Sequence, residues 1–431
     1  MKRAIALLAV VGLLLVGCKS NDDDGDGGAT GDPTRPASTE PGRGVTADAI
    51  TIGTTYVDLS AIKEIMNLDH GDYAATFEAV AEWINDTGGI NGRRLELVDA
   101  PVSPIGTEEG TTTCIELTED VGVFAVLGTP QPDIVPCYVT DHETALVGGS
   151  MSEELLAAAE APWFTWLAST DRLATKTIEG AADAGVFEGK KVGIVTAAIY
   201  EPVVDASVKP ALADAGVEIA DVGVIDTPPD DPAAATAAAQ TIAEKFKSEG
   251  IEVVVSVAQT FSTWADGVVQ TDYRPVQVTT DSNTVGAWVV LKDDSQLAIL
   301  EDSVVGSAAP AEVWWNTEAM QECVAQIEER TGTTIVNPIG YVEGEGPSTF
   351  VSAQAVCATM TLFKAIAEKA GDTLNNDTFL AAGHELGVFQ VPGVGGESDY
   401  TASDPTGAPP VYLATFDMAT KQLVAEPDPV P

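Results

Sequence analysis

Short apolar runs alternate with amphipathic stretches along most of the chain from about residue 49. The runs have the length and the β-branched content of buried strands, and the stretches between them repeat apolar residues at the spacing of one helix face. This alternation is typical of an α/β fold in which helices cover parallel sheets. Strands are expected at residues 50–55, 94–98, 123–127, 145–148, 164–168, 191–196, 219–224, 252–257, 276–280 and 303–308.

The amphipathic stretches predict helices between these strands. In one of them Ile242 and Phe246 are four residues apart, and Lys247 and Gly250 mark its end, as is usual at a helix C-terminus. Five strands followed by five more indicate two Rossmann-like lobes rather than one large sheet. Helices are expected at residues 71–87, 170–184, 202–215, 232–249 and 348–370, and a closing strand hairpin at 411–417 and 423–425.

The first residues have the pattern of an export signal. Lys2 and Arg3 precede an apolar run, residues 4–16, that is too short for a permanent membrane span. The run ends in Leu-Val-Gly-Cys at residues 15–18, which resembles the lipobox of bacterial lipoproteins. This predicts a signal peptide at residues 1–17 and lipid modification of Cys18. The alternatives are a signal peptide with an incidental cysteine and a single-pass anchor.

Residues 18–44 predict a flexible tether between this anchor and the folded part. They contain no large apolar side chain after Cys18 and are rich in Asp, Gly, Pro, Ser and Thr. Such a segment cannot bury enough surface to fold. No segment beyond the signal region reaches 18 apolar residues without charges, so contact with the membrane is expected through the lipid anchor only.

The composition of the chain argues against several classes of function. The 431 residues include 66 acidic and 21 basic side chains, a net charge of −45, which disfavours binding to nucleic acid or to anionic lipid. Apolar residues make up 45% of the chain, enough for a large core. With three histidines and five cysteines, no resident metal or cofactor is expected.

The four cysteines that follow Cys18 are even in number, as is usual for disulfides in exported proteins. They allow three pairings, and no CxxC spacing indicates a redox or zinc motif. The local pairing is expected, with Cys114 joined to Cys137 and Cys323 joined to Cys357. Each bridge would contribute on the order of 3–4 kcal/mol by the chain-entropy estimate.

Two segments resemble a known family. Residues 45–53, Val-Thr-Ala-Asp-Ala-Ile-Thr-Ile-Gly, are similar to the opening of type I periplasmic binding proteins. Residues 84–93 follow the pattern I-N-x-x-G-G-[IV]-N-G-[RK], whose glycines end a helix and turn the chain into the next strand. With the lipobox, the resemblance indicates the branched-chain amino-acid group of solute-binding subunits of ABC importers. It covers about residues 45–430.

The resemblance implies the fold and the site. Two α/β lobes with parallel sheets would be joined by three crossover segments, the first lobe formed by residues 45–168 plus about 313–385 and the second by 169–312 plus about 386–431. Ligand would lie between the lobes, held by loops that follow the strands. The contacts carried over are Tyr56, Asp58, Ser60, Thr129, Gln131, Gly149, Ser150 and Ser152 from the first lobe, and Tyr200, Gln259, Thr260, Phe261 and Asp281 from the second.

The carried-over site departs from the family at two places. The loop at residues 129–132 has one hydroxyl where the family often has several serines, and Asp281 replaces a longer glutamate that pairs with the ligand ammonium. Aromatic residues could enlarge the pocket, although burial in the core is their commoner role. These aromatic residues are Trp163, Trp166, Trp264 and Trp288.

No catalytic motif is complete. Ser152 occupies the last position of a Gly-x-Ser-x-Gly-like segment, and His384-Glu385 lacks the second histidine of a zinc helix. An enzyme is therefore not expected. The sequence predicts a monomeric, lipid-anchored receptor on the outer face of the cytoplasmic membrane, which binds an amino acid or related carboxylate and delivers it to ABC permease subunits. The alternative is a sensor of the same fold coupled to a signalling partner.

Overall fold

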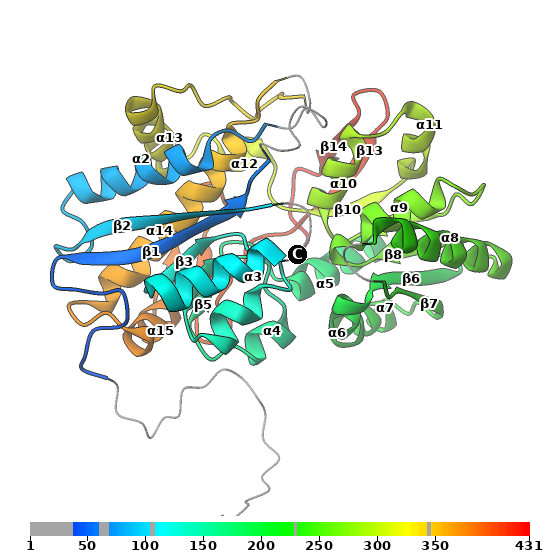
Figure 1. Ribbon diagram of the computed structural model, residues 1–431. Helices are drawn as coiled ribbons and strands as arrows, with labels where there is room; N and C mark the ends of the chain where they lie inside the picture. Colours follow the sequence, from blue (N-terminus) through cyan, green and yellow to red (C-terminus); the bar gives the residue numbers. More distant parts are fainter. Residues whose placement is uncertain (1–37, 60–68, 104–107, 228–230, 343–345) are drawn as a thin grey trace, which may run out of the picture.

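The computed structural model describes residues 38–59, 69–103, 108–227, 231–342 and 346–431. These residues form two lobes side by side, each with a parallel sheet between helices (Figure 1). The α/β fold with two Rossmann-like lobes is therefore confirmed.

The first lobe contains a five-stranded sheet in the order β2-β1-β3-β4-β5. All of its strand pairs are parallel. β5 is shorter than predicted, because Thr165 already bonds outside the sheet, through its N–H to the carbonyl of Pro405 and through its hydroxyl to that of Gly149. The strands are β1 (Ala49–Val57), β2 (Arg94–Val102), β3 (Ala125–Gly128), β4 (Ala145–Gly148) and β5 (Trp163–Phe164).

The second lobe contains a seven-stranded sheet in the order β14-β13-β10-β9-β8-β6-β7. Its first five strands in the chain pair in parallel, and the predicted hairpin of β13 and β14 adds an antiparallel edge beside β10. These strands are β6 (Val192–Ala197), β7 (Ile219–Ile225), β8 (Val253–Ser256), β9 (Val276–Thr279), β10 (Val304–Ser307), β13 (Tyr412–Asp417) and β14 (Gln422–Ala425).

Helices cover both faces of each sheet. Those of the first lobe are α2 (Tyr73–Asp86), α3 (Glu108–Ile115), α4 (Glu153–Ala157), α12 (Ala311–Trp314), α13 (Glu318–Thr331), α14 (Phe350–Ala370) and α15 (Asn376–His384). Those of the second lobe are α5 (Thr170–Asp183), α6 (Glu201–Val203), α7 (Lys209–Asp214), α8 (Pro232–Glu249), α9 (Phe261–Val268), α10 (Ser282–Val290) and α11 (Asp294–Leu297).

The helix predicted at residues 202–215 contains a π-helical turn, Val204–Val208, between α6 and α7. Pro210 lacks the N–H that a continuous α-helix would use at that position. The N–H of Lys209 bonds instead to the carbonyl of Val204, five residues earlier. The wider turn keeps the chain helical past the proline.

The largest core lies between the first sheet and helices α2, α13, α14 and α15, where Phe77, Ile327, Phe363 and Phe379 are buried. α14 is long and apolar enough to cross a membrane by length and composition. However, 61% of its most apolar window is buried inside the protein. It therefore serves as the central helix of this core.

The helix-to-strand motif at residues 84–93 connects α2 to β2. Gly89 has a φ of 67°, and a Cβ atom there would lie 2.0 Å from the carbonyl oxygen of Arg93. The side-chain amide of Asn91 donates to the carbonyls of Glu368 and Gly371, at 3.1 Å each, at the end of α14. The motif thus attaches the β1–β2 edge of the sheet to the central helix.

The end of the predicted tether is folded onto the first lobe. The side-chain amide of Asn375 donates to the carbonyls of Ser38 and Glu40, and the Gly42 N–H donates to the carbonyl of Leu374. The Arg43 guanidinium donates to the carbonyl of Thr118 at 2.8 Å. The prediction of a flexible tether was therefore wrong for residues 38–44. It rested on the lack of large apolar side chains, but these residues are held by hydrogen bonds, which need none. Residues 1–37, including Cys18, lie outside the described residues.

Three crossing segments join the lobes, at residues 165–169, 308–310 and 401–411. The third comes later than the expected boundary at about residue 386. Residues Val391, Val394 and Tyr400 belong to the first-lobe core, and β11 (Gly387–Phe389) pairs with β12 (Ser398–Tyr400) in a separate hairpin. The chain enters the second sheet only with β13.

Both disulfides follow the local pairing that was expected. Cys114 is joined to Cys137 and Cys323 to Cys357, with sequence separations of 23 and 34 residues. The second bridge ties α13 to α14 inside the first-lobe core.

A buried carboxylate connects the lobes beside the first crossing. Asp171, at the start of α5, is 4% exposed. It accepts bonds from the backbone N–H of Glu153 in the first lobe at 2.9 Å and from the Ser207 hydroxyl in the second lobe at 2.8 Å.

We expect Asp171→Asn to lower the free energy of unfolding by about 1.5–3 kcal/mol, because a hydrogen bond to a charged group is lost. Chemical denaturation measures this loss, and the exposed Asp183→Asn on the same helix is the control. Equal stabilities of the two variants would contradict the bridging role.

Candidate functional site

A cavity of about 480 Å³ lies between the lobes, and we call it the interlobe cleft. Several of its polar residues lie at or shortly after the ends of strands of both sheets, where the carboxyl ends of parallel strands meet. From the first lobe these residues are Thr129 after β3 and Ser150 after β4. From the second lobe they are Tyr200, Gln259 and Asp281, which follow β6, β8 and β9, and Ser307, which is the last residue of β10.

The rest of the cleft wall is largely aromatic and aliphatic. The Trp166 ring comes from the first crossing, and its indole N–H donates to the Thr359 hydroxyl of α14 at 3.0 Å. The Gln354 amide, also on α14, donates to the carbonyl of Gly393 at 2.6 Å. These bonds fix the orientation of both side chains. Apolar lining residues include Leu167, Ala258, Ala308, Val351, Val394 and Pro410.

Asp281 is the only acidic residue among the described lining residues, and no Lys, Arg or His is among them. Its carboxylate caps α10 by accepting the N–H of Asn283 at 2.9 Å. Burial raises the pKa of Asp281 above its ordinary value of 3.8, while the bonds from Asn283 and Thr284 oppose this rise. The cleft therefore offers one carboxyl group that water hydrates poorly.

Two tyrosines supply hydroxyl groups that stay protonated. Burial raises the pKa of Tyr200 well above its ordinary value, and the nearby carboxylates of Asp281 and Asp133 raise it further. Burial raises the pKa of Tyr73 to about 12. Both hydroxyls can therefore donate hydrogen bonds to a ligand at neutral pH.

The structure brings five of the predicted contacts to the cleft: Thr129, Ser150, Tyr200, Gln259 and Asp281. They come from both lobes, so a ligand in the cleft can contact both at once.

Tyr56 and Asp58 line a neighbouring cavity of about 530 Å³ instead. The Tyr56 hydroxyl donates to Asp99 at 3.3 Å, and its ring stacks on Tyr73, with the centroids 5.0 Å apart. Tyr73 lines both cavities, whereas Tyr56 lines only the second. Ser60 lies outside the described residues.

The other described contacts that were predicted are not among the lining residues of the cleft. The Ser152 hydroxyl caps α4, and the Thr260 hydroxyl accepts the N–H of Ala197 at 2.9 Å. Phe261 is buried against Trp288. The carbonyl of Gln131 accepts the N–H of Ile134, and the carbonyl of Gly149 accepts the Thr165 hydroxyl. We therefore omit these five residues from the proposed site.

Of the four tryptophans considered for the pocket, only Trp166 lines the cleft. Trp163, Trp264 and Trp288 are buried in the cores, as is commoner for this residue. The sequence reasoning missed Tyr73, Ser307, Gln354 and Asn283. Asn283 follows the strand predicted at residues 276–280 and could have been found by that signal, whereas Ser307 lies inside the strand predicted at residues 303–308. Tyr73 and Gln354 lie on helices, where no local pattern distinguishes a cleft residue.

Solved structures with the same fold are numerous, and the following three are examples that are similar to this chain over most of its length. A substrate-binding protein of an ABC transporter from Desulfitobacterium hafniense, in complex with Leu, is 16% identical, with a TM-score of 0.57 over 88% of this chain and 100% of that one. A fatty acid ABC transporter substrate-binding protein from Thermomonospora curvata is 14% identical, with a TM-score of 0.61 over 91% and 97%. A putative branched-chain amino acid ABC transporter protein from Silicibacter pomeroyi is 14% identical, with a TM-score of 0.59 over 89% and 97%.

No curated protein sequence matches the chain. Residues 68–422, however, match the family described as periplasmic binding protein. This match spans both lobes and all the cleft residues named above. Together with the type I fold, it shows that the chain belongs to the periplasmic binding protein family, whose members bind small solutes outside the cytoplasm.

Proposed function

We propose that the protein is the solute-binding subunit of an ABC importer and holds an amino acid or a related carboxylate in the interlobe cleft. The observation that carries the proposal is the cleft itself, which combines hydroxyl donors from the first lobe with a single carboxylate from the second. The ABC transporter proteins from D. hafniense and S. pomeroyi, with the same fold, support this class of function.

The chemistry of the cleft assigns a role to each end of the ligand. The hydroxyls of Thr129 and Ser150 would hold a carboxylate by neutral hydrogen bonds, since no basic side chain lines the described part of the cleft. Asp281 would pair with an ammonium group by a charge-assisted bond. Trp166 and Val351 would cover an apolar side chain between these ends.

Ligand that touches both lobes favours the closed arrangement over the open one, because contacts to both lobes form together only when the cleft is closed. The permease subunits would recognise this closed form of a monomeric receptor. No step of this cycle requires a cofactor or a covalent reaction.

A thermal-shift screen of amino acids, their amides and decarboxylated amines, and small carboxylates tests the proposal. A ligand at 100 times its Kd should stabilise the protein by about 2.7 kcal/mol. Stabilisation by an apolar amino acid, but not by its decarboxylated amine, supports the assigned contacts. A complete screen without any stabilising compound would contradict an amino-acid receptor.

The lipobox supports a lipid anchor on the outer face of the cytoplasmic membrane. We expect Cys18→Ala to abolish lipid modification and to move the protein from the membrane fraction to the soluble fraction or to leave it unprocessed. Fractionation and metabolic labelling with a fatty acid measure both effects. Cys18→Ala protein that remains in the pellet and keeps its lipid label would disprove the anchor.

A further inference from the structure

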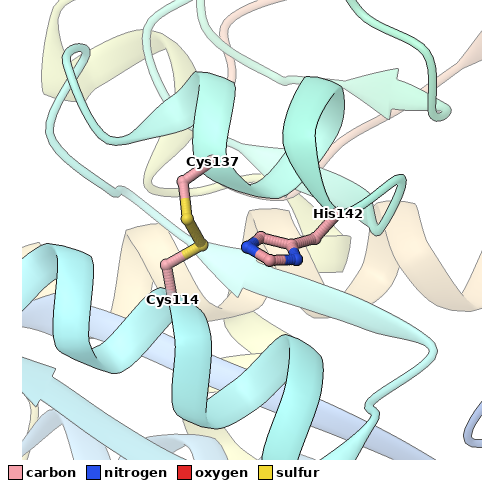
Figure 2. A group of neighbouring side chains, drawn as sticks. All are labelled: Cys114, Cys137 and His142. Atoms are coloured by element: carbon pink, nitrogen blue, oxygen red, sulfur yellow. A yellow bond between two sulfur atoms is a disulfide. The ribbon is translucent and has the colours of Figure 1, made fainter. Parts of the chain in front are cut away.

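A histidine lies beside the disulfide between Cys114 and Cys137, on the first lobe and away from the residues that line the interlobe cleft (Figure 2). A ring nitrogen of His142 and the two sulfur atoms all lie within 4.8 Å of one another. Cys114 is buried, whereas Cys137 and His142 are partly exposed. The group is thus held by the fold and is also accessible from solvent.

A carboxylate orients the histidine. The Nδ1 atom of His142 lies 3.5 Å from Oε1 of Glu119. Metal-binding histidines commonly donate their second ring N–H to a carboxylate, which fixes the tautomer and makes the other nitrogen more basic. Figure 2 shows a ring nitrogen of His142 turned toward the disulfide. With Nδ1 engaged by Glu119, Nε2 is the nitrogen suited to bind a metal.

Two π-helical turns shape this group. Cys114 lies two residues before η1 (Glu116–Val121), and Cys137 begins η2 (Cys137–Asp141). The N–H of His142 bonds to the carbonyl of Cys137 at 3.1 Å, which is the five-residue spacing of a π-turn. An α-helix would separate these two residues by about 140° around its axis, so the π-turn is what brings them together. Such turns frequently accompany functional sites.

We propose that Cys114, Cys137 and His142 form a zinc site that the disulfide closes and that reduction opens. A dithiol reductant supplies two electrons and two protons, the S–S bond breaks, two thiols form, and the reductant becomes a disulfide. Zn²⁺ then binds both sulfurs and Nε2 and releases the two thiol protons. Two thiolates and an imidazole are ligands that Zn²⁺ prefers, and the fourth position stays open to water.

The second disulfide provides an internal control. Cys323 and Cys357 are fully buried between α13 and α14. Within the described ranges, no histidine or carboxylate joins them in a comparable group. A dithiol that opens both bridges therefore creates a three-ligand site at only one of them.

The experiment uses the full-length protein, either oxidised or reduced with a dithiol and desalted without oxygen. We expect the reduced form alone to bind one Zn²⁺ by calorimetry, and Co²⁺ to give a thiolate charge-transfer band. Alkylation followed by mass spectrometry should show that Zn²⁺ protects Cys114 and Cys137. His142→Ala should weaken binding at least tenfold, and Glu119→Gln about tenfold, as for other residues that orient metal ligands. His70→Ala, elsewhere on the first lobe, is the control.

Three binding outcomes would overturn the zinc site. They are equal Zn²⁺ binding by the oxidised and reduced forms, unchanged affinity in His142→Ala, and protection of Cys323 and Cys357 instead. Circular dichroism of the reduced protein checks that it keeps its fold. A reduced chain that unfolds and is not refolded by Zn²⁺ would also overturn the proposal.

Discussion

Asp281→Asn should lower the affinity for an amine-bearing ligand by roughly 200- to 5000-fold. Asp281 is the only acidic residue among the described cleft residues, so an ammonium buried there has no other ionic partner. Removing one member of a buried ion pair typically costs about 3–5 kcal/mol, which corresponds to this change in affinity. Calorimetry with the ligand found by the thermal-shift screen measures the loss.

Asp281 also caps α10, so a loss of cap must be separated from a loss of ligand contact. Asp293→Asn is the matched control, because Asp293 caps the neighbouring helix α11 through the N–H groups of Ser295 and Gln296 and lies outside the cleft. The control should bind as the wild type does. If Asp281→Asn weakens binding less than about threefold, Asp281 acts only as a cap.

The raised pKa of Asp281 also predicts how binding depends on pH. The ion pair needs the ionised carboxylate, so affinity should fall as the pH drops through this raised pKa, earlier than for an ordinary carboxyl group. In the ligand-free protein the sign is opposite, since the folded state holds the proton more tightly than the unfolded state. Burial of Asp281 thus lowers stability as the pH rises. Calorimetry at several pH values should show the acid-side loss in the wild type and a flatter profile in Asp281→Asn.

Replacing both Cys323 and Cys357 by serine should lower the free energy of unfolding by about 3–4 kcal/mol. The bridge closes a loop with a sequence separation of 34 residues, and opening it restores conformational freedom to the unfolded chain. The two sulfurs also lie in the first-lobe core, so buried hydroxyls without partners would add to the loss. Chemical denaturation under oxidising conditions gives the value.

The wild-type protein with both disulfides reduced is the comparison. It should be less stable than the double serine variant, because that variant keeps the bridge between Cys114 and Cys137. A double variant within about 1 kcal/mol of the wild type would mean that the bridge contributes little. Ligand affinity should change far less than stability, because neither cysteine lines the interlobe cleft.

The sheets could be predicted because both faces of their central strands are buried. β8 and β4, for example, are continuous apolar or small-residue runs bounded by polar turns. The local disulfides followed from cysteine parity and spacing. The docking of residues 38–44 could not be predicted, because it depends on backbone bonds to Asn375 and Leu374 far along the chain.

The cleft was predictable where it follows strands and unpredictable elsewhere. Asp281 and Ser150 come directly after β9 and β4, so the rule for parallel sheets places them at the cleft. Thr260 and Phe261 come four and five residues after β8, and the short helical turn after that strand directs them into the core. Gln354 reaches the cleft only because α14 packs under the first sheet, which no local pattern contains.

The third crossing segment bears on how the lobes move. Its Pro405 carbonyl accepts the N–H of Thr165, and its Pro409 carbonyl accepts the Arg172 guanidinium at 3.1 Å, so it is bonded to the first crossing and to the start of α5. The prolines of this crossing segment also fix the backbone angle φ at their own positions. Because these hydrogen bonds join the third crossing to the first, we expect the two segments to move together when the cleft opens or closes.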